Sequence, residues 1–174
     1  MPLYADKNSI YKVRTLLDSG AGHSWIAKGI LKYVNYTRMP AQRLTIGTLN
    51  GSVRRKCSLV QVYFRTHTLI PIECFVLDDF IEHIMVHGVK KYLREHTDLK
   101  EEVIKNIVDP AEINVDHANI SMGTALVLSN AATALVYPLQ SIKLNIQTHR
   151  LILEQTIFGI TLSGEIPQCL RANN

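Results

Sequence analysis

The sequence has few cysteines and no long hydrophobic run. Its three cysteines, Cys57, Cys74 and Cys169, are an odd number without C-x-x-C spacing, which argues against a disulfide framework and indicates a reducing compartment. No stretch approaches the roughly twenty apolar residues that span a bilayer, and the N-terminus lacks the hydrophobic run of a signal peptide. The sequence therefore predicts a soluble, intracellular protein without membrane contact.

Positive charge exceeds negative charge only slightly. The formal net charge is +4, and the basic residues are scattered except for Arg54-Arg55-Lys56 and Lys90-Lys91. So weak a bias is not the footprint of a nucleic-acid-binding protein, and nucleic acid is not an expected partner. The run at 54–56 is most simply a solvated face; a functional role would be contact with an acidic substrate or with RNA.

The overall composition is that of an ordinary globular protein. Hydrophobic residues make up 47% and charged residues 20% of the 174 positions, which is enough apolar material for a core. There is no internal repeat or low-complexity linker. The length predicts a single domain over 1–174, or a compact core that carries an insertion.

An acidic residue stands at the edge of a predicted strand. Residues Ile10–Leu17 mix β-branched, aromatic and alternating polar residues, which predicts a strand that ends at Asp18. Gly20 and Gly22 permit a tight turn, and His23–Ile26 is the expected return strand. A carboxylate at the edge of a core can hold or release a proton near neutral pH, as a general acid or base must.

Extended chain and a hairpin are expected next. Residues Ala27–Val34 have the spacing of a short helix, and the pattern from Gln42 to Phe64 is that of two strands. Asn50-Gly51 between them is a strong hairpin signal, because a type I′ turn needs positive φ at both central positions. Thr68–Leu77 predicts a further strand, which Pro71 places at an edge or a bulge.

Residues 78–116 break the β pattern. Apolar residues recur there at helical spacing, and charged residues fill the positions between them: Val89, Tyr92, Leu93, Val103, Ile104 and Ile107. We expect one or two helices, closed by Asp109-Pro110. Because the flanking chain is β in character, this segment is predicted to be a helical insertion packed against one side.

The C-terminal third returns to β-structure. Asn119–Leu128 is nearly uncharged and predicts a buried strand, while Ala131–Val136 fits either a short helix or a continuation of that strand. Ser141–Gln147 and Arg150–Leu153 predict a hairpin, and Thr156–Ser163 a last strand.

The residues around Asp18 resemble a known signature. Leu17-Asp18-Ser19-Gly20-Ala21 matches the Asp-Ser/Thr-Gly-Ala motif of aspartic peptidases, and the chain is similar to the retropepsin-like protease of BEL/Pao retrotransposons. Ile120-Ser121-Met122-Gly123 partly matches the family's apolar-apolar-Gly element, with Ser121 in place of an aliphatic residue. Phe158–Gly164 resembles its closing segment, with Ile160 in place of an aromatic residue.

The resemblance implies a mostly β, retropepsin-like acid protease fold with one lobe per chain. Peptide hydrolysis by acid-base catalysis needs two carboxyl groups that share a proton, yet no other aspartate is followed by Ser/Thr-Gly. The chain therefore carries half a site, and the resemblance implies that a homodimer completes it. It assigns catalysis to Asp18, with Ser19 and Gly20 as supports, and substrate binding to Ala21 and the flap tip Leu49, Asn50, Gly51 and Ser52.

By the same resemblance the substrate is a polypeptide, the retrotransposon polyprotein, processed in the cytoplasm or within retrotransposon particles. No metal or organic cofactor is expected, because His83 and His87 are four apart but Ile84 stands where H-E-x-x-H has its Glu. An alternative function is a catalytically inactive dimerisation or peptide-binding module on the same fold, which would bind extended peptide by strand addition. A retroelement nucleic-acid-binding protein rests only on the basic pI.

Overall fold

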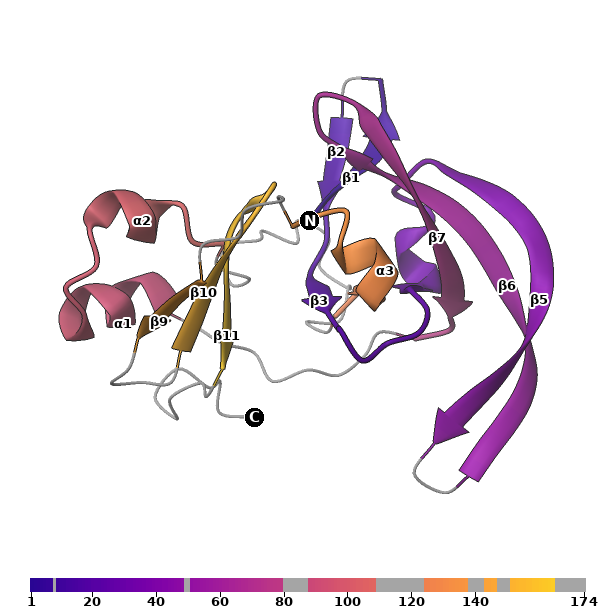
Figure 1. Cartoon of the computed structure of the whole chain (residues 1–174). Helices are drawn as coiled ribbons and strands as arrows, with labels where there is room; N and C mark the ends of the chain where they lie inside the picture. Colours follow the sequence, from indigo (N-terminus) through magenta and orange to yellow (C-terminus); the bar gives the residue numbers. More distant parts are fainter. Residues whose placement is uncertain are drawn as a thin grey trace. The chain divides into compact units, whose positions relative to one another are not determined.

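The described part of the chain forms two compact units. The computed structural model describes residues 1–7, 9–48, 51–79, 88–108, 124–137, 143–146 and 151–164. The N-terminal unit comprises Met1–Ile81 and Thr124–Ala132, and the C-terminal unit comprises Glu82–Gly123 and Thr133–Asn174. Both contain β-sheet (Figure 1), so the prediction of a mostly β protein is confirmed.

An eight-stranded sheet makes up most of the N-terminal unit. Its strand order is β2-β1-β6-β7-β4-β8-β3, and β5 pairs with β6 outside this path. The strands are β1 (Pro2–Asp6), β2 (Ser9–Lys12), β3 (Thr15–Leu17), β4 (Trp25–Ala27), β5 (Tyr36–Thr48), β6 (Gly51–Arg65), β7 (Leu69–Leu77) and β8 (Leu126–Leu128). Of the helix expected over 27–34, the structure forms one 3₁₀ turn, η1 (Lys28–Ile30).

Strand β8 lies between β3 and β4, although it follows them far along the chain. It runs parallel to β3, with Leu16 opposite Val127, and antiparallel to β4, with Ile26 opposite Leu126. All three of its residues are buried, as a strand covered on both faces requires. The buried strand expected within 119–128 is confirmed for 126–128; residues 119–123, with the apolar-apolar-Gly element, lie outside the described residues.

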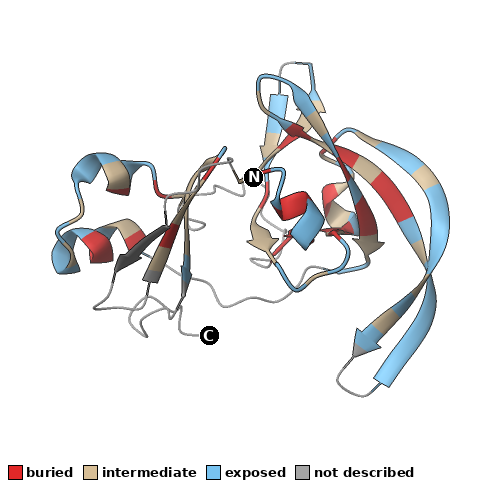
Figure 2. Ribbon diagram, in the orientation of Figure 1, coloured by how far each residue is buried: buried red, intermediate tan, exposed pale blue. Residues whose placement is uncertain are grey.

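The predicted hairpin is confirmed and is longer than expected. Its pairing runs from Tyr36 opposite Val62 to Thr48 opposite Gly51, so Leu49 and Asn50, which lie outside the described residues, connect the strands. Only the inner half of β6 joins the sheet, because β7 pairs with residues 59–65. Residues 51–56 are exposed, and this half of the hairpin is a two-stranded twisted ribbon (Figures 1 and 2).

Pro71 lies where β7 has a neighbour on one side. It is opposite Tyr63 of β6, whereas β4 pairs only with Phe75–Leu77. Because proline has no N–H to donate, a position with one hydrogen-bonded neighbour accommodates it. The expected edge position is therefore confirmed.

The C-terminal unit combines two helices with a three-stranded sheet of order β11-β10-β9. Its elements are α1 (Val89–His96), α2 (Glu101–Lys105), β9 (Lys143–Ile146), β10 (Leu151–Thr156) and β11 (Gly159–Gly164). The two helices within 78–116 and the hairpin of β9 and β10 are as predicted. The last strand begins later than Thr156, because a turn at 157–158 divides β10 from β11.

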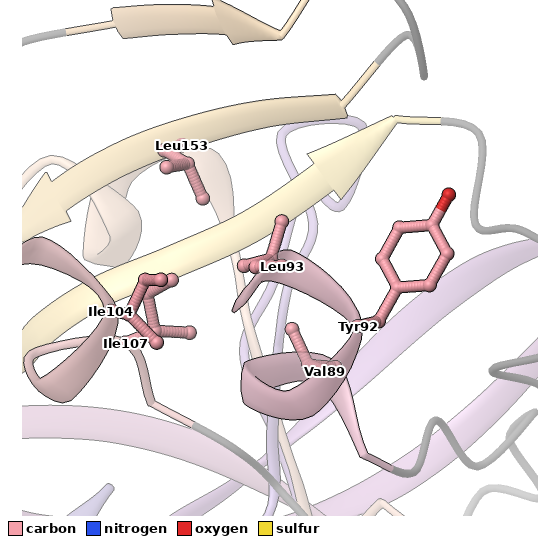
Figure 3. Close-up of a cluster of buried hydrophobic side chains, with 6 residues drawn as sticks. All are labelled: Val89, Tyr92, Leu93, Ile104, Ile107 and Leu153. Carbon is pink, nitrogen blue, oxygen red and sulfur yellow. The ribbon is translucent and has the colours of Figure 1, made fainter. Parts of the chain in front are cut away.

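The helices share one core with the C-terminal sheet. Side chains from α1, from α2, from the segment directly after α2 and from β10 form a buried cluster (Figure 3): Val89, Tyr92, Leu93, Ile104, Ile107 and Leu153. Ile107 also forms a parallel bridge with Ile160 of β11. The sequence predicted a single domain with a helical insertion, whereas the structure groups these helices with β9–β11 in a second unit, because β10 buries their apolar faces.

The segment after β8 is a short helix, α3 (Asn130–Thr133). The sequence left this segment open between helix and strand, and the structure decides for helix. Ser129 begins it, because the Ser129 Oγ accepts a hydrogen bond from the Ala132 N–H at 3.3 Å, as an N-cap residue does.

Candidate functional site

The backbone around Asp18 is tied to β8 and to its own turn. The Asp18 N–H donates to the Leu128 carbonyl at 3.1 Å, and the Ala21 N–H donates to the Asp18 carbonyl at 3.1 Å. The carboxylate Oδ1 accepts from the Gly20 N–H at 2.9 Å. An Asp side chain that accepts from the backbone two residues on is a common turn feature, and here it fixes the orientation of a half-buried carboxylate.

The closeness of this contact favours glycine at position 20. A Cβ at position 20 would lie 3.3 Å from Asp18 Oδ1, so a larger residue would push on the oxygen that the Gly20 N–H holds. Ser19 and Gly20 are both exposed. In this turn the close approach at Gly20 is that of its backbone N–H to the Asp18 carboxylate.

Two buried serines connect the Asp18 loop to the chain after β8. The Ser24 Oγ donates to the Ser129 Oγ at 3.2 Å and accepts from the Ser129 N–H at 3.0 Å. The Asn130 N–H donates to the Ala21 carbonyl at 3.1 Å. The sequence does not predict a role for Ser24 or Ser129, since two serines 105 positions apart carry no signal of their pairing.

A cleft of about 660 Å³ opens beside Asp18 within the N-terminal unit. The residues that line it come from β3, the Asp18 loop, β4, the β5–β6 hairpin, β7 and β8: Leu16, Asp18, Ala21, Trp25, Lys28, Ile46, Arg55, Lys56, Cys57, Ser58, Val76, Leu77, Asp78 and Val127. We call it the Asp18 cleft. Its volume leaves room for a segment of extended peptide, with the Asp18 carboxylate at its edge and the β5–β6 hairpin as one wall.

The predicted substrate-binding residues are placed unevenly around this cleft. Ala21 lines it. Gly51 and Ser52 are exposed at the start of β6 and are not among its lining residues, and Leu49 and Asn50 lie outside the described residues. The hairpin contributes instead through Ile46 and through residues 55–58, which the sequence did not single out as cleft residues.

The charges around the Asp18 cleft are unequally balanced. Lys28 and Asp78 directly follow Ala27 and Leu77, which are register partners on two parallel strands, so a cation and an anion stand at neighbouring strand ends. Among the described residues no ion pair involves Lys28, Asp78, Arg55 or Lys56. Arg55 and Lys56 make the hairpin wall a basic side of the cleft.

The two described cysteines differ in environment. Cys57 is half-buried and lines the cleft, whereas Cys74 of β7 is fully buried. Burial, with a smaller contribution from the Glu73 carboxylate, raises the pKa of the Cys74 thiol to about 12. Cys74 is therefore a protonated core residue, as expected of a structural thiol.

Within the described ranges, no group of three His, Cys, Asp or Glu side chains could hold a metal ion, and His83 and His87 lie outside these ranges. None of the helices described is long and apolar enough to cross a membrane.

Comparisons of the chain with protein-family models, with curated proteins and with solved structures find no match.

Proposed function

We propose that this chain is one half of a homodimeric aspartic endopeptidase. The observation that carries the proposal is the placement of Asp18: its carboxylate is oriented by the Gly20 N–H and lines a cleft of about 660 Å³. The strand that precedes it ends against buried β8, so the carboxylate stands at the edge of a core. The resemblance of Leu17–Ala21 to the aspartic-peptidase motif suggests that this carboxylate catalyses peptide hydrolysis.

The reaction needs a second carboxyl group, which a copy of the same loop would supply across a two-fold axis. Two carboxyl groups brought close together in this way share one proton, because both cannot ionise together. The ionised Asp18 takes a proton from water, whose oxygen attacks the peptide carbonyl carbon. The protonated Asp18 of the other chain donates to the carbonyl oxygen, which gives a tetrahedral diol. The carboxyl group that took the proton from water then passes it to the peptide nitrogen, the other carboxylate recovers a proton from a diol hydroxyl, and the C–N bond breaks to release an amine and a carboxylic acid.

The topology around the loop supports a retropepsin-like lobe. Strands β3 and β4 flank β8, and the Asp18 loop connects β3 to β4. Hydrogen bonds to Leu128 and from Asn130 hold the loop at Asp18 and at Ala21. A long hairpin forms a wall of the cleft, the position from which a flap closes over substrate. The proposed substrate is a polypeptide in extended conformation, and a retrotransposon polyprotein inside the cell or the particle is its expected source.

The test is cleavage of an unstructured protein across a pH series, with the mass of each sample measured in solution. The matched pair of variants is Asp18→Asn and Asp78→Asn, because both aspartates line the same cleft. We expect a dimer with a bell-shaped pH dependence, no activity in Asp18→Asn and retained activity in Asp78→Asn. A folded dimer without cleavage at any pH, or an active Asp18→Asn variant, would refute the proposal.

One observation favours a second function, that of a non-catalytic peptide-binding module. Strand β5 is thirteen residues long and, among the described strands, pairs only with β6. An unpaired edge of this length can accept an extended peptide as an added strand. This function predicts that a labelled peptide binds the native chain and Asp18→Asn equally well and is recovered uncut from both.

A further inference from the structure

The basic run at 54–56 lies on a ribbon that few other elements cover. Among the described strands, β5 is the one that pairs with residues 52–57 of β6, and residues 51–56 are all exposed. The register sets Arg43 directly opposite Lys56 and Leu44 opposite Arg55. Like charges at directly opposed positions oppose strand pairing, so the hairpin keeps these cations at a cost to its own stability.

Alternation along the strands divides the cations between two faces. Side chains two apart share a face, and Arg55 and Ile46 both line the Asp18 cleft. A second hollow, of about 450 Å³, is lined by Arg43 and Arg54, which do not line the Asp18 cleft, and also by Arg55 and Lys56, which line both. Of the hairpin arginines Arg43, Arg54 and Arg55, only Arg55 lines the Asp18 cleft, and the register sets Arg43 on the opposite face of the ribbon from Arg55.

The cleft offers both apolar and cationic contacts to a bound chain. Leu16, Trp25, Val76 and Val127 supply apolar surface, suited to an aliphatic side chain near the cleaved bond. Neither Lys28 nor Arg55 has a carboxylate within ion-pair distance among the described residues, but Asp78 follows the strand end next to that of Lys28, and no strand end with an acidic residue adjoins Arg55 in the hairpin. A guanidinium in this setting has its planar donors free for a carboxylate from outside the chain.

We propose that Arg55 makes the Asp18 cleft selective for polypeptides that carry an acidic side chain, Asp or Glu, a few residues from an apolar cleavage site. This inference rests on the proposed peptidase function and names its substrate class. Because Arg55 is exposed, its contact with a carboxylate is screened by solvent and salt. The expected preference for Glu over Gln is about two- to fivefold in kcat/KM at low salt, and it decreases as salt is added.

The test uses matched peptides with one apolar cleavage site and Glu, Gln or Lys at each nearby position in turn. Cleavage is compared for the native chain, Arg55→Glu, Arg55→Gln and the control Arg43→Glu, which makes the same charge change on the other face of the hairpin. We expect Arg55→Glu to prefer Lys, Arg55→Gln to lose the preference and Arg43→Glu to keep the native preference for Glu. Circular dichroism and Trp25 fluorescence establish that each variant is folded.

A preference for Glu that survives in both Arg55 variants would overturn the inference, as would its equal loss in Arg43→Glu. Affinities of the same peptides for the chain in an Asp18→Asn background provide a readout that does not need catalysis. Selective binding of Glu peptides without any cleavage would sustain Arg55 selectivity while the peptidase function failed. Tight binding of a single-stranded oligonucleotide that Arg43→Glu and Arg55→Glu both abolish would instead make the hairpin a nucleic-acid surface and refute the inference.

Discussion

Replacing Ser24 by alanine tests how firmly the Asp18 loop is anchored. The Ser24 hydroxyl is the acceptor for the Ser129 N–H at 3.0 Å and the donor to the Ser129 Oγ at 3.2 Å. The two residues are only 4% and 6% exposed, so water has little access to replace the lost partner. Ser24→Ala therefore leaves a buried backbone N–H without an acceptor.

The expected cost follows from these contacts. A buried N–H left without a partner costs about 1–3 kcal/mol, and the lost hydroxyl–hydroxyl bond adds about 1 kcal/mol. The Ser129 Oγ keeps the Ala132 N–H as a donor, which limits the loss. We expect the free energy of unfolding of the N-terminal unit to fall by about 2–3 kcal/mol, equivalent to about 10–20 °C in Tm for a unit of this size.

The chain contains a single tryptophan, Trp25, which lies next to Ser24 and packs on Phe75 with ring centroids 5.5 Å apart. Its fluorescence during urea denaturation reports the N-terminal unit. The control is Ser9→Ala, an exposed serine in β2, with an expected change below about 0.5 kcal/mol. Equal effects of the two variants, or strict additivity of Ser24→Ala with Ser129→Ala, would refute the coupling of the two hydroxyls.

Two further predictions concern other parts of the fold. Gly159→Ala should destabilise the C-terminal unit by about 2–4 kcal/mol in chemical denaturation followed by circular dichroism: φ there is +121° and a Cβ would lie 2.9 Å from the Asn106 carbonyl oxygen. Gly22→Ala, with open space around the Cβ, is its control, and equal losses would contradict the prediction. In a Cys169→Ser background, a thiol reagent should modify Cys57 much faster than Cys74 at pH 8. The Cys74 thiol has a pKa near 9 in the unfolded chain, and burial raises its pKa to about 12 in the folded chain. The free energy of unfolding should therefore fall by about 1.4 kcal/mol per pH unit between pH 9 and pH 12, because only the unfolded chain loses this proton there. Cys74→Val should remove this fall, and a fall of the same size in Cys74→Val would contradict the burial of the thiol.

Local sequence patterns predicted the elements well. Asn50-Gly51 between two extended runs predicted the hairpin of β5 and β6, and the helical spacing from Val89 to Ile107 predicted α1 and α2. Each signal arises from residues within a few positions of one another, which is the range over which turn geometry and amphipathic periodicity act. The single strand predicted over Ile10–Leu17 is wrong in part, because the structure divides it into β2 (Ser9–Lys12) and β3 (Thr15–Leu17), the second of which ends directly before Asp18.

These local patterns do not predict which strands and side chains pair when they lie far apart in the sequence. The apolar residues of β8 predict burial but not insertion between β3 and β4, and Leu153 gives no sign that its partners are in α1 and α2. The candidate site depends on such pairings: the Ser24–Ser129 contact joins residues 105 positions apart. The basic run at 54–56 was visible in the sequence, but only the register of the hairpin identifies Arg55 as the arginine that lines the cleft.

The position of β8 between β3 and β4 delays completion of this part of the sheet while the chain is synthesised on the ribosome. Leu126 is translated about 100 residues after Ala27, a delay of about 5–20 s at ordinary rates of synthesis. Until then the place between β3 and β4 is empty, and the Asp18 N–H lacks the Leu128 carbonyl that accepts its hydrogen bond. The loop that bears the proposed catalytic carboxylate thus takes its final form only after the intervening chain has emerged.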